Sequence, residues 1–110
     1  MLPKYRKPAH PGEILLRDFL EPYGLTQKKL ADHLGCTYTR INEIINGHRG
    51  ISADTALALS EAFSTDVEFW MNLQNNWALW QAKAAHQTVP FLDLSNQKDQ
   101  LSRRNRNVSD

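Results

Sequence analysis

The segment that decides the fold is Leu25–Gly50, which reads LTQKKLADHLGCTYTRINEIINGHRG. It holds two short stretches with apolar residues at helical spacing, separated by a turn that contains Gly35. Thr26 and Thr37 stand where the helices would begin, and threonine is a favoured N-cap because its side-chain oxygen accepts a backbone N–H of the first turn. The pattern therefore predicts helices over 26–34 and 37–46, joined as a helix-turn-helix.

The outer face of the second predicted helix suits DNA recognition. Ile41 and Ile44 would face the core and leave a polar face outward. An arginine fork can read guanine, an asparagine amide can read adenine, and a threonine methyl can contact thymine. We therefore predict that the base-reading residues are Tyr38, Thr39, Arg40, Asn42 and Glu43. For Arg40, contact with phosphate alone is an equally open interpretation.

Phosphate contacts are expected at the helix ends. Backbone N–H groups at a helix N-terminus attract phosphate, and polar residues that follow a recognition helix can hold the DNA backbone. The predicted phosphate-contacting residues are Thr26, Gln27, Thr37, Asn46, His48 and Arg49.

Helix breakers divide the rest of the chain into three further helical segments. The first begins near Pro11 and ends at Pro22. Ser52 would cap the fourth helix, and Thr65 with Glu68 reads as a capping box for the fifth. The fold class predicted from these signals is all-α, a bundle of five helices.

We expect three regions along the chain. Residues 1–9 form a basic N-terminal arm, and residues 10–84 form the helix-turn-helix DNA-binding domain, with its recognition helix at about 37–46. Residues 85–110 form a C-terminal extension. Within it, Val89–Leu94 could be an edge strand at best because it contains a proline, and the polar composition predicts a mobile tail from residue 95.

Charge and composition argue against several classes of protein. The chain has 110 residues with 13 basic and 12 acidic side chains, a net charge of +1, so any nucleic-acid surface must be local. The single cysteine, Cys36, excludes an intramolecular disulfide framework and fits a reducing compartment. The histidines show no metal-binding spacing, and no phosphate-binding glycine loop is present. We expect no catalytic residue, metal site or cofactor. No apolar run suits a membrane helix or a secretory signal, so a cytoplasmic protein is expected.

A stripe of large apolar residues marks the fifth predicted helix. Trp70, Leu73, Trp77 and Trp80 recur at a spacing typical of helix pairing. Trp70 is expected in the monomer core. A single helix-turn-helix makes few DNA contacts and commonly binds paired half-sites as a two-fold dimer. We therefore predict that Trp77 and Trp80 lie at a homodimer interface.

Segment 26–50 resembles the helix-turn-helix of the Xre, or phage-repressor, class. With HPGEIL at 10–15 and FWMNLQ at 69–74, the wider chain is similar to HigA-type antitoxins, also called VapI-like. The resemblance implies a five-helix phage-repressor-like fold. It also implies a dimer that binds double-stranded operator DNA, represses its own operon, and neutralises a HigB toxin, a RelE-like enzyme that cuts mRNA on the ribosome.

The resemblance also assigns roles to single residues. It places Gln27 at a phosphate-contacting position and Tyr38, Thr39 and Glu43 at base-facing positions. Ser64 stands where glycine is common in the family, and His48 stands where lysine is common.

Two alternatives stay open from the sequence. One is a stand-alone transcriptional regulator with the same helix-turn-helix and no toxin partner. The other is a protein-interaction module that does not bind DNA. DNA binding with a steep salt dependence would distinguish the antitoxin and the stand-alone regulator from the protein-interaction module.

Overall fold

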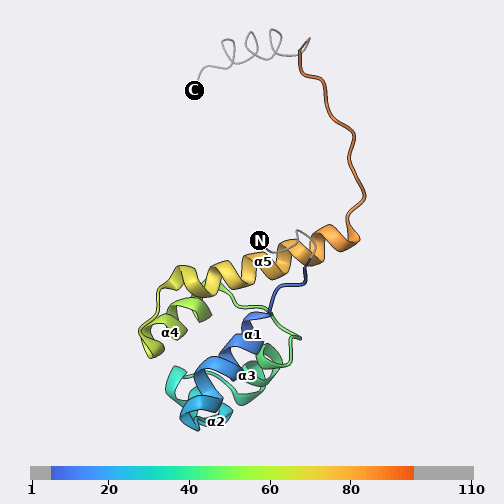
Figure 1. The fold of residues 1–110 in the computed structure, drawn as a ribbon. Coiled ribbons are helices and arrows are strands. Elements are labelled where there is room, and N and C mark those ends of the chain that lie inside the picture. Colours follow the sequence, from blue (N-terminus) through green and yellow to red (C-terminus); the bar gives the residue numbers. More distant parts are fainter. Residues whose placement is uncertain (1–5, 96–110) are drawn as a thin grey trace, which may run out of the picture.

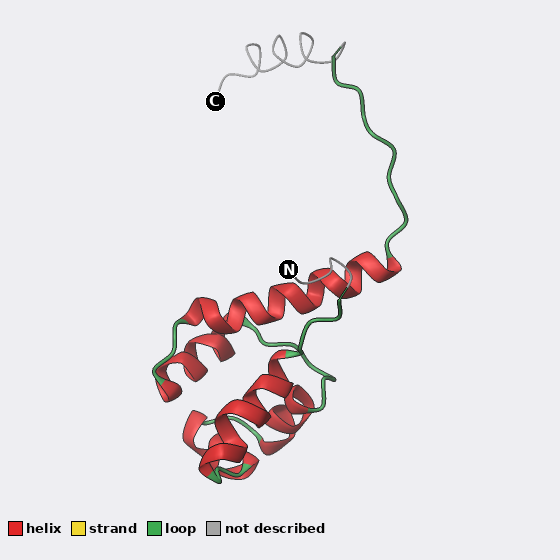
Figure 2. Ribbon diagram, in the orientation of Figure 1, coloured by secondary structure: helices red, strands yellow, loops and turns green. Residues whose placement is uncertain are grey.

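The computed structural model describes residues 6–95 and confirms the all-α, five-helix prediction. The first helical segment comprises α1 (Pro11–Ile14), the π-helical η1 (Leu15–Leu20) and the 3-10 turn η2 (Glu21–Tyr23). It is followed by α2 (Gln27–Leu34), α3 (Tyr38–Ile45), α4 (Ala53–Phe63) and α5 (Val67–Ala85), all drawn in Figures 1 and 2. Residues 6–95 contain no strand, so the edge strand considered for Val89–Leu94 does not form.

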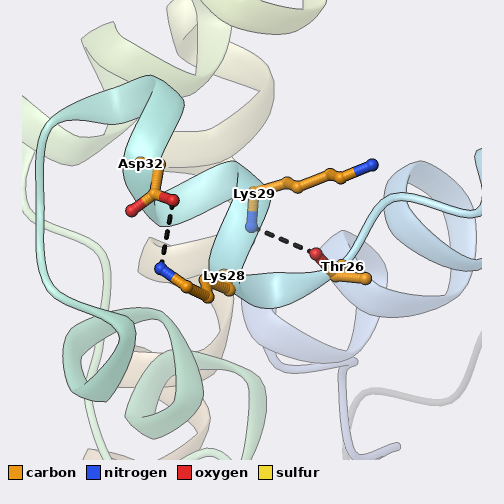
Figure 3. Close-up of polar contacts among 4 residues, drawn as sticks. All are labelled: Thr26, Lys28, Lys29 and Asp32. Atoms are coloured by element: carbon orange, nitrogen blue, oxygen red, sulfur yellow. Dashed lines mark hydrogen bonds and ion pairs between the residues drawn. The ribbon is translucent and has the colours of Figure 1, made fainter.

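Local signals fix the ends of α2 and α3. The Thr26 hydroxyl accepts the backbone N–H of Lys29 at 3.1 Å, as Figure 3 shows, and the Thr37 hydroxyl accepts that of Arg40 at the same distance. Gly35 ends α2 in the left-handed region with φ 76°. These are the caps that the sequence predicted, and they confirm the helix-turn-helix.

The first helical segment packs against α3, with the backbone of Gly12 close to that of Ile44. His10 caps α1, because its Nδ1 accepts the Gly12 N–H at 2.9 Å. A Cβ atom on Gly12 would lie 1.8 Å from the carbonyl oxygen of Ile44, so only glycine lets α1 pack against the end of α3. This contact sets the position of α3 on the rest of the bundle.

The segment η1 and the helices α2 to α5 contribute to one hydrophobic core. In Figure 1, α5 is the long helix that crosses above the others, and α1 contacts both α3 and α5. Ile41 and Ile44 are buried as predicted, and so is Trp70. The buried core consists of Leu15, Leu20, Leu30, Ala31, Ile41, Ile44, Ile51, Ala56, Leu59 and Trp70.

The capping box predicted for α5 is wrong. The helix begins at Val67 after Asp66, and no side chain caps it. The Thr65 hydroxyl instead accepts the indole N–H of Trp70 at 2.8 Å. Because a buried indole nitrogen needs an acceptor, the bond to Trp70 takes precedence over the capping bond.

Beyond α5 the chain leaves the bundle. Residues 86–95 run away from the helices in Figure 1, and their side chains are exposed, Phe91 by 92%. The tail predicted to be mobile falls mostly at 96–110, and Lys4 of the basic arm at 1–5; both stretches lie outside the described residues.

Candidate nucleic-acid interface

The predicted base-reading residues do not share one environment. Tyr38 is 52% exposed and Thr39 is exposed, both in the first turn of α3. Glu43 is half-buried, and its carboxylate contacts the Arg49 guanidinium at 3.2 Å. Tyr38 and Thr39 therefore present the side chains most accessible to a DNA groove.

Asn42 is the centre of a chain of amide hydrogen bonds. Its Nδ2 donates to Gln27 Oε1 at 3.0 Å and lies 3.5 Å from the Tyr38 hydroxyl. Its Oδ1 accepts from Asn46 Nδ2 at 3.0 Å. Tyr38 and Asn42 lie on α3, Asn46 directly follows it and Gln27 begins α2, so Asn42 ties the two helices together. The Gln27 oxygen accepts this bond, so the Gln27 amide N–H groups remain available as donors to a ligand such as a phosphate.

Arg40 leans toward α4. Its side chain is half-buried and lines a cavity of about 220 Å³ together with Cys36 and Asp54. The Nε atom is buried and has no hydrogen-bond partner among the described residues. Arg40 is therefore less exposed than Tyr38 and Thr39, and it borders a cavity that residues of α4 also line.

The predicted phosphate-contacting residues gather at two places. Thr26, Gln27 and Thr37 lie at the N-terminal ends of α2 and α3, where both threonine hydroxyls already serve as caps. Asn46, His48 and Arg49 follow α3 and are exposed. Thr26 and Thr37 can still donate their hydroxyl proton to a phosphate, since capping uses only the oxygen as acceptor.

Two residues that bear on this surface were not predicted. Lys29 is exposed in the first turn of α2 and extends away from the helix in Figure 3, whereas Lys28 is paired with Asp32 at 3.2 Å. The sequence could have indicated Lys29, because it is a basic residue two positions after Gln27. Gln74 of α5 accepts the Ile51 N–H at 2.7 Å and so fixes the loop after α3. Only the three-dimensional fold reveals that contact.

Trp77 and Trp80 carry part of the N-terminal segment. Both are half-buried, with ring centroids 5.5 Å apart. The Lys7 ammonium lies 5.3 Å from the Trp77 ring and 5.6 Å from the Trp80 ring, and the His10 ring meets Trp77 edge-on at 5.0 Å. Lys7 and His10 of the same chain therefore cover one side of the two rings.

The surroundings of His10 change its titration. Burial lowers the pKa of the His10 imidazole, while the nearby Glu13 carboxylate acts in the opposite direction. The neutral form is the one that the fold needs, because an unprotonated Nδ1 accepts the Gly12 N–H.

Within residues 6–95, no group of three or more histidine, cysteine or acidic side chains is arranged to hold a metal ion. Over the same range, no helix is both long and apolar enough to cross a membrane.

Comparison with known proteins places this geometry in a family. Residues 16–70 match the helix-turn-helix family. Virulence-associated protein I of Dichelobacter nodosus is 44% identical over 81% of this chain and 83% of its own length. Antitoxin HigA-1 of Vibrio cholerae is 37% identical over 74% of this chain and 77% of its own.

The chain belongs to the HigA-type, Xre-like helix-turn-helix family. A solved structure of Pseudomonas aeruginosa antitoxin HigA with the higBA promoter superposes with a TM-score of 0.69 at 38% identity. The match covers 77% of this chain and 99% of that one. The HigA-type resemblance deduced from the HPGEIL and FWMNLQ motifs is therefore confirmed.

Proposed function

We propose that this protein is an operator-binding repressor of the HigA type that acts as a homodimer. The observation that carries the proposal is the exposed first turn of α3, with Tyr38 and Thr39 outward and the amide chain of Gln27 and Asn42 beside it. The similar Pseudomonas aeruginosa antitoxin HigA was solved with promoter DNA, which supports the same role for this surface.

In this proposal α3 enters the major groove, which admits an α-helix. Tyr38, Thr39 and Glu43 face the base edges. Gln27 at the start of α2 holds a phosphate, and so do Asn46, His48 and Arg49 after α3. Further donors are the hydroxyls of Thr26 and Thr37 and the first-turn N–H groups of α2 and α3. The dimer places a second α3 one helical turn along the DNA and blocks transcription from the chain's own promoter.

Two residues take roles that differ from direct base reading. The bond from Asn42 to Gln27 favours a positioning role, in which Asn42 holds the phosphate-binding amide. The placement of Arg40 against α4 favours a phosphate contact at most, reached by its guanidinium end. Of the two interpretations of Arg40 that the sequence left open, phosphate contact is the one we propose.

The dimer contact is proposed for the second half of α5. Trp77 and Trp80 are half-buried, although the N-terminal segment covers one side of them, and Leu79 between them is 54% exposed. Tryptophan is enriched at the centre of protein interfaces, because its large ring loses much water-exposed area on contact.

The second part of the proposal is neutralisation of a HigB or RelE-like toxin in the bacterial cytoplasm. It is supported by the family and by relatives such as Antitoxin HigA-1 of Vibrio cholerae. Without a toxin partner, the same geometry would serve a stand-alone regulator.

Co-expression tests both parts. The tagged chain is produced with the small open reading frame adjacent to its gene, and copurification, growth and binding of the purified chain to the upstream DNA are measured. Growth arrest by the neighbour alone, rescue by this chain and a stoichiometric complex would support the antitoxin. Operator binding without toxicity or complex would leave the stand-alone regulator. Absence of operator binding, with a complex formed, would leave a protein-interaction module.

A further inference from the structure

The N-terminal segment is held against α5 from two sides. Lys7 lies over both Trp77 and Trp80 at cation–π distance, and His10 packs edge-on against Trp77 while it caps α1. Figure 1 shows this segment running from α5 down to α1. These contacts hold Lys7 and His10 against α5, and Arg6 directly precedes Lys7 in the chain.

This segment forms one wall of a cleft that ends at the recognition helix. The cleft has a volume of about 790 Å³ and lies between the N-terminal segment, α5 and the C-terminal end of α3. Arg6 and Lys7 line one side, and Asn46 and Gly47 line the other. Asn46 belongs to the proposed phosphate-contacting residues, so the cleft continues that surface beyond the end of α3.

The charges on the cleft indicate which partner fits it. Two cations face one carboxylate, that of Glu13 in the first turn of α1. Within residues 1–10 there are three basic side chains and no acidic one. An excess of positive charge beside a polar amide is typical of a phosphate contact. A basic protein partner would be repelled by the same charges.

We propose that this cleft takes a phosphodiester group of the operator, with Arg6 as the cation that contacts it and Lys7 as the residue that positions the segment through the two tryptophans. The inference rests on the proposed operator binding. It extends the DNA surface from α2 and α3 to the N-terminal segment and gives Trp77 and Trp80 a role within one protomer.

The test is operator affinity measured by fluorescence anisotropy over a series of salt concentrations. Each phosphate contact contributes about 0.9 to the slope of log affinity against log salt, so a dimeric Arg6→Gln variant should lose about 2 from that slope. Its affinity should fall by about tenfold at fixed salt, with the order of preference among operator variants unchanged. Lys7→Gln should reduce the slope too, and Lys7→Arg should restore it, because arginine keeps the cation–π contact.

Arg17→Gln is the matched control. Arg17 is an exposed cation on η1 that pairs with Asp18 at 3.2 Å and does not line this cleft. It should leave the slope unchanged. Thermal unfolding of every variant checks that the fold is kept.

The outcomes separate this inference from the proposed function. If the unaltered chain binds no operator, the proposed function fails. If the chain binds and Arg6→Gln keeps the full slope, or loses no more than Arg17→Gln, the cleft proposal is overturned. Loss of toxin binding by Arg6→Gln with operator binding intact would also overturn it, because the cleft would then serve the toxin.

Discussion

The helix-turn-helix and the long helix α5 differ in how their apolar side chains are buried within one chain. In α2 and α3, each helix buries a narrow apolar stripe, and the caps and the Lys28–Asp32 pair join residues three or four apart. In α5, Trp70 is buried, whereas Leu79 is 54% exposed nine residues later. The comparison teaches that the first half of α5 completes the core, while the second half supports the N-terminal segment and is available for further contacts.

The largest expected effect is on stability, and it should differ between substitutions in the first and second halves of α5. Trp70→Ala removes the largest buried ring and leaves the Thr65 hydroxyl without its partner, so it should lower the free energy of unfolding by about 3–5 kcal/mol. Trp80→Ala should cost far less in the monomer and should instead weaken dimerisation. Urea unfolding and sedimentation at several protein concentrations measure the two effects. Equal destabilisation by both variants, with the dimer intact, would remove the distinction between the halves.

The next effect concerns the link between α2 and α3. Gln27→Ala should weaken operator binding by about 1–2 kcal/mol through loss of a phosphate hydrogen bond. Asn42→Ala should cost a similar amount, because Gln27 loses the partner that orients it. In a double-mutant cycle the two losses should therefore not add. Additive losses, or an altered base preference in Asn42→Ala, would show instead that Asn42 reads a base directly.

A smaller effect is expected from acid. Burial lowers the pKa of His10 below its ordinary value of 6.5, so the unfolded chain binds a proton more readily than the folded chain. The free energy of unfolding should therefore fall as the pH drops through about 6.5, and the fall should end below the folded pKa. His10→Asn keeps an N-cap acceptor and does not titrate in this range, so it serves as the control in urea unfolding from pH 7.5 to pH 5. Identical pH profiles for the two proteins would contradict the assignment.

The smallest effect is a gain in stability at the end of α4. Ser64 has φ 56°, in the left-handed region that favours glycine, and it is the one described non-glycine residue with a positive φ. Ser64→Gly should raise the free energy of unfolding by about 0.5–1 kcal/mol. Thermal unfolding measures the change, and a loss of stability would show that the serine side chain contributes a contact that outweighs the backbone strain.

The fold was predictable where its determinants are local. Thr26, Thr37 and Gly35 act within a few residues of themselves, and the helices begin and end where these residues predict. Prediction failed for Thr65, because its partner Trp70 is chosen by burial and not by helix capping. The need for glycine at position 12 depends on a carbonyl 32 residues away in the sequence, at Ile44. A contact across that separation carries no local signal in the sequence.

The candidate site was predictable as a surface but not as a set of individual roles. The polar face of α3 follows from helical periodicity, and Tyr38 and Thr39 lie on it as exposed residues. The same periodicity could not show that Arg40 leans toward α4 or that Asn42 binds Gln27. Those roles depend on how α3 packs against its neighbours.

The central claim is that the first turn of α3 reads the operator in front of this gene. The most direct measurement is anisotropy with the upstream DNA and its base-substituted variants, using the intact chain, Tyr38→Ala, Thr39→Ala, and Asn72→Ala as an exposed control on α5. The account predicts sequence-specific binding that Asn72→Ala preserves, and a changed base preference in the two α3 variants. Binding with no preference among the DNA variants, or a preference that both α3 variants retain, would contradict it.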